Sequence, residues 1–369
     1  MKNFNYLIAL YLSINGYEMF LKYTYHISFP ISITKFLIIG YSIYLLLFIY
    51  KKRIKIKINF TESIFYIILF IFFIFSFWNI EEGFKYSLSM LMVFTLIFLL
   101  KQVKKYLDLN KIIDYSVYMT IPLIVLNFIF SFNNNYFSWK HQFFGAFGNA
   151  NIFGMWVIFI LASIYLFKGN KNLRGVLFFV VLYMIIISLG RANILTAFLI
   201  LFLYFRNNLK IIFTSSLFVI ALLTYFSQEL PLITYIVNRF SEVNSRAYSD
   251  MFLPVINNDF LPHGTYSFSD YMWSIGETPD SSYFALLYDI GFLVVLYIIP
   301  FLYIMIKSNF EMKVLIFALL FQSLFEKIFV SPVNSYFIFI LMIMIIFPHL
   351  FVKPKRRIFY NEKNINIHR

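Results

Sequence analysis

Apolar runs long enough to cross a lipid bilayer recur along this whole chain, and they constrain its fold more than any other feature. A helix needs about 20 apolar residues to cross the hydrocarbon core. Short hinges, many of them rich in lysine, separate the runs. Hydrophobic residues make up 61% of the 369 residues, charged residues only 13%, and the mean hydropathy is +0.78. These values exclude a water-soluble domain and predict an all-α, polytopic membrane protein.

About twelve transmembrane helices fit this pattern, and residues 1–369 form a single membrane domain. We expect the spans near residues 4–21, 33–50, 62–79, 84–100, 112–131, 149–167, 175–189, 192–205, 211–227, 283–306, 314–330 and 336–352. Met1–Phe20 lacks a cleavable signal pattern, so we expect the first span to be retained.

The distribution of basic residues predicts how the chain is oriented in the membrane. The net charge is +14, and most Lys and Arg lie in the short hinges, as in Lys51-Lys52-Arg53. Cytoplasmic hinges carry an excess of Lys and Arg, so we expect these hinges and both termini to be cytoplasmic. The clustering argues for a multi-pass membrane protein and against nucleic-acid binding.

One large polar segment, residues 228–282, stands apart from the spans and falls on the extracytoplasmic side of this topology. It contains seven of the 17 Asp and Glu residues, two arginines and no lysine. A single large loop on one face is where we expect chemistry or recognition.

Three arginines are candidates for anion binding. Arg191 follows Gly190 in the turn between two expected spans, and arginine at membrane depth is costly unless it is paired. Its planar guanidinium suits phosphate oxygens, although an arginine can also extend to lipid headgroups. Arg239 and Arg246 lie in the first half of the large loop, where solvated salt bridges are the structural alternative. His263 lies in the second half and is either a turn residue or a titrating group.

The end of the large loop carries a second set of candidates. Asp280, Ser281 and Tyr283 stand where the loop enters the expected span 283–306, and a helix cap is the structural alternative for Asp280. Asp289 follows within that span, where a carboxylate is expensive and is expected to pair with an arginine.

Small residues open the expected span 149–167. Glycines there permit close helix packing, and Asn149 and Asn151 are candidates to hold a lipid-linked headgroup. The chain has no cysteine and no GxxxxGK[ST], HExxH or GxSxG motif, and its five histidines show no metal-ligand spacing. We therefore expect no metal and no cofactor.

Four of these segments, in this order, resemble elements of the O-antigen polymerase and O-antigen ligase superfamily, the Wzy-like membrane proteins of bacterial surface polysaccharide assembly. They are Gly145–Gly154, Ser188–Arg191, Arg246 in the large loop, and Pro279–Tyr283 leading into Tyr288–Gly291. The chain departs from the family pattern at Ala150, where proline is common, and at Ala192, where glycine is common.

The resemblance implies a GT-C-like fold and a metal-independent glycosyltransferase of the bacterial cytoplasmic membrane. Its substrates would be undecaprenyl diphosphate-linked oligosaccharides, as donor and acceptor, in lipopolysaccharide (O-antigen), capsule or exopolysaccharide biosynthesis. Arg191 and Arg246 would neutralise the departing diphosphate. Asp280 stands where ligases of this superfamily carry histidine, so the resemblance favours a polymerase, with a flippase and a chain-length regulator as partners. In that role Asp280 would orient or deprotonate the acceptor hydroxyl.

Two alternatives remain open. The first is an O-antigen ligase-type transferase, which would hand finished polymer to another acceptor. The second is a non-enzymatic lipid-linked oligosaccharide flippase, against which the large loop argues.

Overall fold

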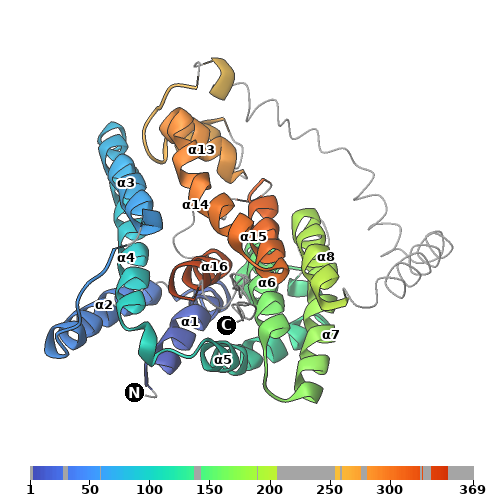
Figure 1. The fold of residues 1–369 in the computed structure, drawn as a ribbon. Helices are drawn as coiled ribbons and strands as arrows, with labels where there is room; N and C mark the ends of the chain where they lie inside the picture. The colour runs from blue at the N-terminus through green and yellow to red at the C-terminus, as the bar shows by residue number, and fades with distance from the viewer. Residues whose placement is uncertain are drawn as a thin grey trace, which may run out of the picture.

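The computed structural model describes residues 3–27, 32–58, 60–136, 143–188, 190–205, 254–257, 260–275, 281–324, 326 and 334–347. The long elements in these residues are α-helices (Figure 1). They are α1 (Asn3–Thr24), α2 (Ile33–Lys51), α3 (Phe60–Phe75), α4 (Glu82–Gln102), α5 (Leu109–Phe130), α6 (Ala150–Leu166), α7 (Lys171–Ser188), α8 (Arg191–Phe205), α12 (Ser267–Ser274), α13 (Ser282–Ile290), α14 (Val294–Lys307), α15 (Phe310–Gln322) and α16 (Ser335–Ile346). The all-α expectation is therefore confirmed for the described residues.

Five segments within these residues are long and apolar enough to cross a membrane. They are Ile33–Lys51, Glu82–Gln102, Leu109–Phe130, Lys171–Ser188 and Ser282–Lys307. Their outward faces are apolar: α2, for example, exposes Phe36, Leu47 and Tyr50. Exposed apolar surface of this extent fits contact with lipid rather than water. The membrane class is supported, whereas the count of twelve spans stays a prediction.

The core is built around α16, which lies centrally among α1, α4, α6 and α15 (Figure 1). Every residue of Ser335–Ile346 is buried. A helix that is apolar all round is stable only where other helices or lipid surround it, so α16 suits the centre of the bundle. Asn334 begins it by accepting a hydrogen bond from Phe337 N at 3.0 Å.

The helix ends form two faces with different character. We call the end of the bundle on which residues 260–275 pack the loop face, and the opposite end the hinge face. Hydrogen bonds tie the lysine-rich hinges together at the hinge face: Lys57 N donates to Gln102 Oε1 at 3.0 Å, and Lys168 N to Asp114 Oδ1 at 3.2 Å. The described hinges near Lys57, Gln102 and Lys168 thus lie opposite the part of the large loop that the structure describes.

The expected single span 283–306 is broken in two. A 3-10 turn, Gly291–Leu293, separates α13 from α14, and Gly291 has φ +62°. An ideal Cβ at Gly291 would lie 2.5 Å from Phe260 O, so glycine lets the loop backbone reach the break. The expected span corresponds to the membrane-length segment Ser282–Lys307, and only the break within it was not predicted, because an apolar run carries no signal of such a break.

Candidate functional site

The first residues of α13 are held at the loop-face end of α15. Ser282 N donates to Ser323 O at 3.0 Å, and Ser282 Oγ donates to Glu326 O at 2.8 Å. Tyr283 Oη donates to Leu320 O at 3.0 Å. The predicted site residues Ser281 and Tyr283 therefore lie beside residues 320–326.

The start of α8 meets the same end of α15. Gln322 Nε2 donates to Asn193 Oδ1 at 2.6 Å, and both side chains are fully buried. Asn193 is two residues after Arg191, the first residue of α8. The backbone of Arg191 thus begins a helix next to α15, and its side chain lies outside the described residues. Asn193 and Gln322 were not among the predicted site residues.

The glycines at the start of α6 allow this region to pack closely. A Cβ at Gly154 would overlap Asn193 Nδ2, so α6 and α8 cross where only glycine fits. Helix packing, the structural explanation considered above, therefore accounts for Gly154. Figure 1 shows α6, α8 and α15 side by side.

Four buried polar atoms in this region have unused hydrogen-bonding capacity. Asn193 Nδ2, Thr196 Oγ1, Ser281 Oγ and Gln322 Oε1 have no hydrogen-bond partner among the described residues. We call these four residues the α8–α15 cluster. An unsatisfied buried polar group costs about 1–3 kcal/mol and is uncommon in native proteins. Amide and hydroxyl groups of this kind can bind the hydroxyls of a sugar.

Glu326 adds a carboxylate to the same region. Its side chain is buried, and its backbone N donates to Gln322 O at 3.0 Å. It was not predicted as a site residue, although an acidic residue inside the expected apolar span 314–330 is a signal that could have found it.

A second assembly lies at the other end of α13. Residues 260–266, which we call the strap, cross the break at Gly291. His263 N donates to Tyr288 O, and Gly264 N to Asp289 O, both at 3.0 Å. The break leaves helix carbonyls without helical partners, and the strap supplies two of the missing donors.

The Asp289 carboxylate fixes the start of α12. Its Oδ2 accepts from Tyr266 N at 2.8 Å and its Oδ1 from Phe268 N at 2.9 Å, and the residue is buried. Asp289 therefore acts as a cap for α12 from a distant part of the sequence. An arginine partner for Asp289 remains a prediction.

His263 belongs to the strap rather than to the α8–α15 cluster. Its ring stacks on Tyr288 with centroids 4.3 Å apart, and its Nε2 is buried without a partner in the described part of the chain. α13 has nine residues, which corresponds to about 13 Å of helix, so the strap and the α8–α15 cluster occupy opposite ends of this helix.

Asn149 has a structural role. Its Oδ1 accepts from Asn151 N at 2.8 Å and from Ile152 N at 3.2 Å, and it is the N-cap of α6. Asn151 lies in the first turn of α6 and is half-buried.

Among the predicted residues, Arg239, Arg246 and Asp280 lie outside those that the structure describes. The residue at the N-cap position of α13 is Ser281, not Asp280, and its side chain makes no capping bond.

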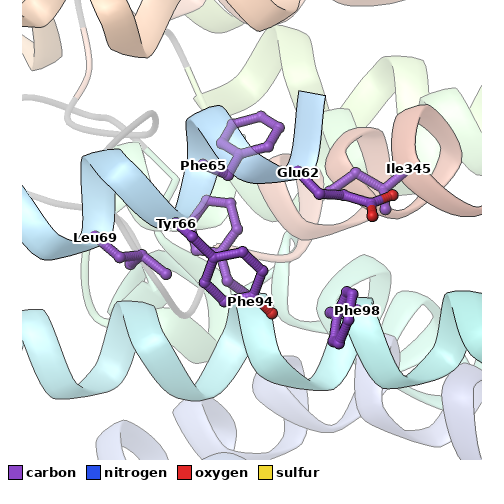
Figure 2. A pocket seen from close by; sticks show the side chains of 7 residues that line it. All are labelled: Glu62, Phe65, Tyr66, Leu69, Phe94, Phe98 and Ile345. Atoms are coloured by element: carbon purple, nitrogen blue, oxygen red, sulfur yellow. The ribbon is translucent and has the colours of Figure 1, made fainter. Parts of the chain in front are cut away.

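A small cavity near the hinge face does not suit a substrate. Figure 2 shows Glu62, Phe65 and Tyr66 of α3 around it, with α4 on one side and Ile345 of α16 on the other. Its volume is about 10 Å³, which is room for one water molecule. Glu62 forms a buried ion pair with Lys101.

The described residues include no group of three or more His, Asp and Glu side chains that could hold a metal ion. No protein-family model matches the chain, and no curated protein or solved structure is significantly similar to it.

Proposed function

We propose that this protein is a polysaccharide polymerase that joins undecaprenyl diphosphate-linked oligosaccharide repeat units at the outer face of the bacterial cytoplasmic membrane. In this proposal the loop face is extracytoplasmic, the hinge face is cytoplasmic, and the bundle has twelve spans and a GT-C-like fold. The substrates come from a flippase, and a chain-length regulator is a further partner.

One observation carries the proposal: three segments far apart in the sequence converge on the loop-face end of α15. They are the opening of α6, the start of α8 at Arg191 and the start of α13 at Ser281. These are three of the four segments that carry the family resemblance. The convergence places buried, hydrogen-bonding side chains next to the backbone of the arginine proposed to bind diphosphate.

The proposed reaction transfers a saccharide between two lipid-linked substrates. The bond from the anomeric carbon of the donor to its diphosphate breaks, and the acceptor hydroxyl oxygen bonds to that carbon. The hydroxyl proton passes to Asp280 or to water, and the carrier diphosphate leaves. Arg191 and Arg246 stabilise the negative charge that grows on the diphosphate, and cations aimed at developing charge accelerate such steps.

The test uses cells deleted for the gene and complemented with tagged wild type, Arg191→Ala, Arg246→Ala or, as a matched control, Arg174→Ala. Arg174 lies in α7 at the hinge face and donates to Phe167 O at 3.4 Å. Surface polysaccharide is separated by size, and the tag reports membrane insertion. We expect a normal ladder with Arg174→Ala. For the other two variants we expect single repeat units on the acceptor and a loss of polymer of about 100- to 1000-fold.

Three outcomes contradict the proposal. Polysaccharide of normal length in cells with Arg191→Ala or Arg246→Ala would rule out the proposed role of the arginines. Full-length polymer left on the lipid carrier in the deletion strain would indicate a ligase. Repeat units retained on the inner leaflet would indicate a flippase.

A further inference from the structure

An open, charged cavity lies on the loop face, away from the α8–α15 cluster. Its volume is about 340 Å³, and its walls come from the end of α1, the start of α2, the start of α4 and Tyr266. Lys22, Lys35 and Lys85 line it together with Glu18 and Glu82, and we call it the lysine pocket.

These lysines lie on the face opposite the lysine-rich hinges. Tyr266 belongs to the strap, so its place in the wall puts the lysine pocket on the loop face whichever side of the membrane that face occupies. Lysines in short loops are depleted on the outer side of membrane proteins. Three of them around one cavity call for a specific explanation.

One lysine is neutralised by its own helix. Lys85 Nζ forms ion pairs with Glu81 at 3.2 Å and Glu82 at 2.9 Å. Glu81, Glu82 and Lys85 lie at the start of α4, where carboxylates also interact favourably with the helix dipole. One ammonium and two carboxylates have a net negative charge, so Lys85 adds no free positive charge to the pocket.

Glu18, which also lines the pocket, is engaged by the start of α2. Glu18 Oε2 accepts from Ser32 Oγ at 2.9 Å, Thr34 N at 3.0 Å and Thr34 Oγ1 at 2.6 Å. These three bonds fasten the start of α2 to α1. No ion pair of Lys22 or Lys35 is present in the part of the chain that the structure describes.

Lys22 and Lys35 therefore line this cavity without an ion pair among the described residues. Lys22 Nζ lies 5.3 Å from the centre of the Tyr23 ring, a cation–π contact that uses the charge but none of its N–H donors. Tyr86 also lines the pocket, but its Oη is buried and does not reach the cavity. The ammonium groups of Lys22 and Lys35 match a phosphate group, for which lysine is a common ligand.

We infer that the lysine pocket is a binding site for a phosphate group, held by Lys22 and Lys35. The phosphate is supplied either by an anionic lipid headgroup or by a soluble phosphate ester. This site is formed by other helices than the α8–α15 cluster and does not depend on the proposed polymerase activity.

The test measures the acylation rate of individual lysines in the full-length protein by peptide mass spectrometry. The protein is placed in phosphatidylcholine nanodiscs, with inorganic phosphate, glucose 1-phosphate or chloride at equal ionic strength. A separate sample uses nanodiscs that contain phosphatidylglycerol. Lys171, an exposed lysine at the start of α7, is the internal control.

We expect acylation of Lys22 and Lys35 to slow several-fold with phosphate while Lys171 is unchanged, and Lys35→Gln to reduce the protection of Lys22. Protection by the soluble phosphates identifies a soluble ester as the ligand, and protection only in phosphatidylglycerol nanodiscs identifies a lipid headgroup. Equal rates in every sample, or equal protection by chloride, would overturn the inference.

Discussion

Asp289 connects two parts of the chain that the sequence separates by more than twenty residues. Its two carboxylate oxygens cap the backbone at Tyr266 and Phe268, and its carbonyl accepts from Gly264 N. A hydrogen bond to a charged group contributes about 1.5–3 kcal/mol, and its loss leaves buried N–H groups unpaired. The position of the strap and of α12 therefore depends strongly on this one side chain.

We expect Asp289→Ala to lower the stability of the strap by about 2–5 kcal/mol, since two buried N–H donors lose their acceptors. Asp289→Asn keeps one acceptor oxygen and should lose less. Limited proteolysis within residues 260–275 measures the effect, with Asp108→Asn as a control. Asp108 also caps a helix, α5, through Asn110 N at 3.1 Å, but it is far from the strap. Unchanged cleavage in Asp289→Ala would show that other contacts hold the strap.

Gly291 and Gly175 form a matched pair for a second test. Alanine at Gly291 must adopt φ near +62° and meets Phe260 O, whereas a Cβ at Gly175 in α7 meets nothing within 4 Å. We expect Gly291→Ala to destabilise the protein by at least about 1–2 kcal/mol and Gly175→Ala to be neutral or stabilising by about 0.4–1 kcal/mol. Thermal unfolding followed by tryptophan fluorescence distinguishes them. Equal melting temperatures would mean that the break tolerates a side chain.

At the scale of the helices, the crossing of α6 and α8 brings together the opening of α6 and the start of α8, two of the segments in the proposed site. Gly154 permits the contact, and Asn193 fills the space on the α8 side while bonding to Gln322 of α15. Because Asn193 is buried and hydrogen-bonded, it cannot readily move away from an added methyl group.

Gly154→Ala should therefore destabilise the bundle by about 1–3 kcal/mol, and the cost should shrink when Asn193 is also replaced by alanine. The four proteins of this double-mutant cycle are compared by thermal unfolding in detergent. If Gly154→Ala costs the same stability with Asn193 and with alanine at position 193, the two residues do not interact, and the close crossing is contradicted.

Helix positions were the part of this structure that the sequence predicted well. The apolar run 33–50 became Ile33–Lys51, and 112–131 became Leu109–Phe130, because membrane-length apolar runs have few other solutions. The break at Gly291 and the capping role of Asp289 were not predicted, since both depend on contacts between distant segments. Gln322 was missed because its bond to Asn193 joins two distant segments, whereas Glu326 had a sequence signal, a carboxylate inside an apolar run, that was not used.

For the molecule as a whole, sidedness is the property on which the functional proposal depends. The hinge face collects the lysine-rich hinges, and the loop face carries the strap, the α8–α15 cluster and the lysine pocket. Charge predicts that the hinge face is cytoplasmic. A polymerase acting on translocated substrates requires the loop face to be outside.

The absence of cysteine makes this orientation directly testable. Single cysteines replace Ser274, exposed beside the strap, or Lys111, exposed at the hinge face, and a membrane-impermeant maleimide is added to spheroplasts. We expect Ser274→Cys to be labelled in intact spheroplasts and Lys111→Cys only after lysis, because the bilayer blocks a charged reagent. Wild type, which has no thiol, is the blank. The reverse pattern would put the strap and the α8–α15 cluster in the cytoplasm, where translocated repeat units are absent, and the polymerase proposal would fail while the fold stood unchanged.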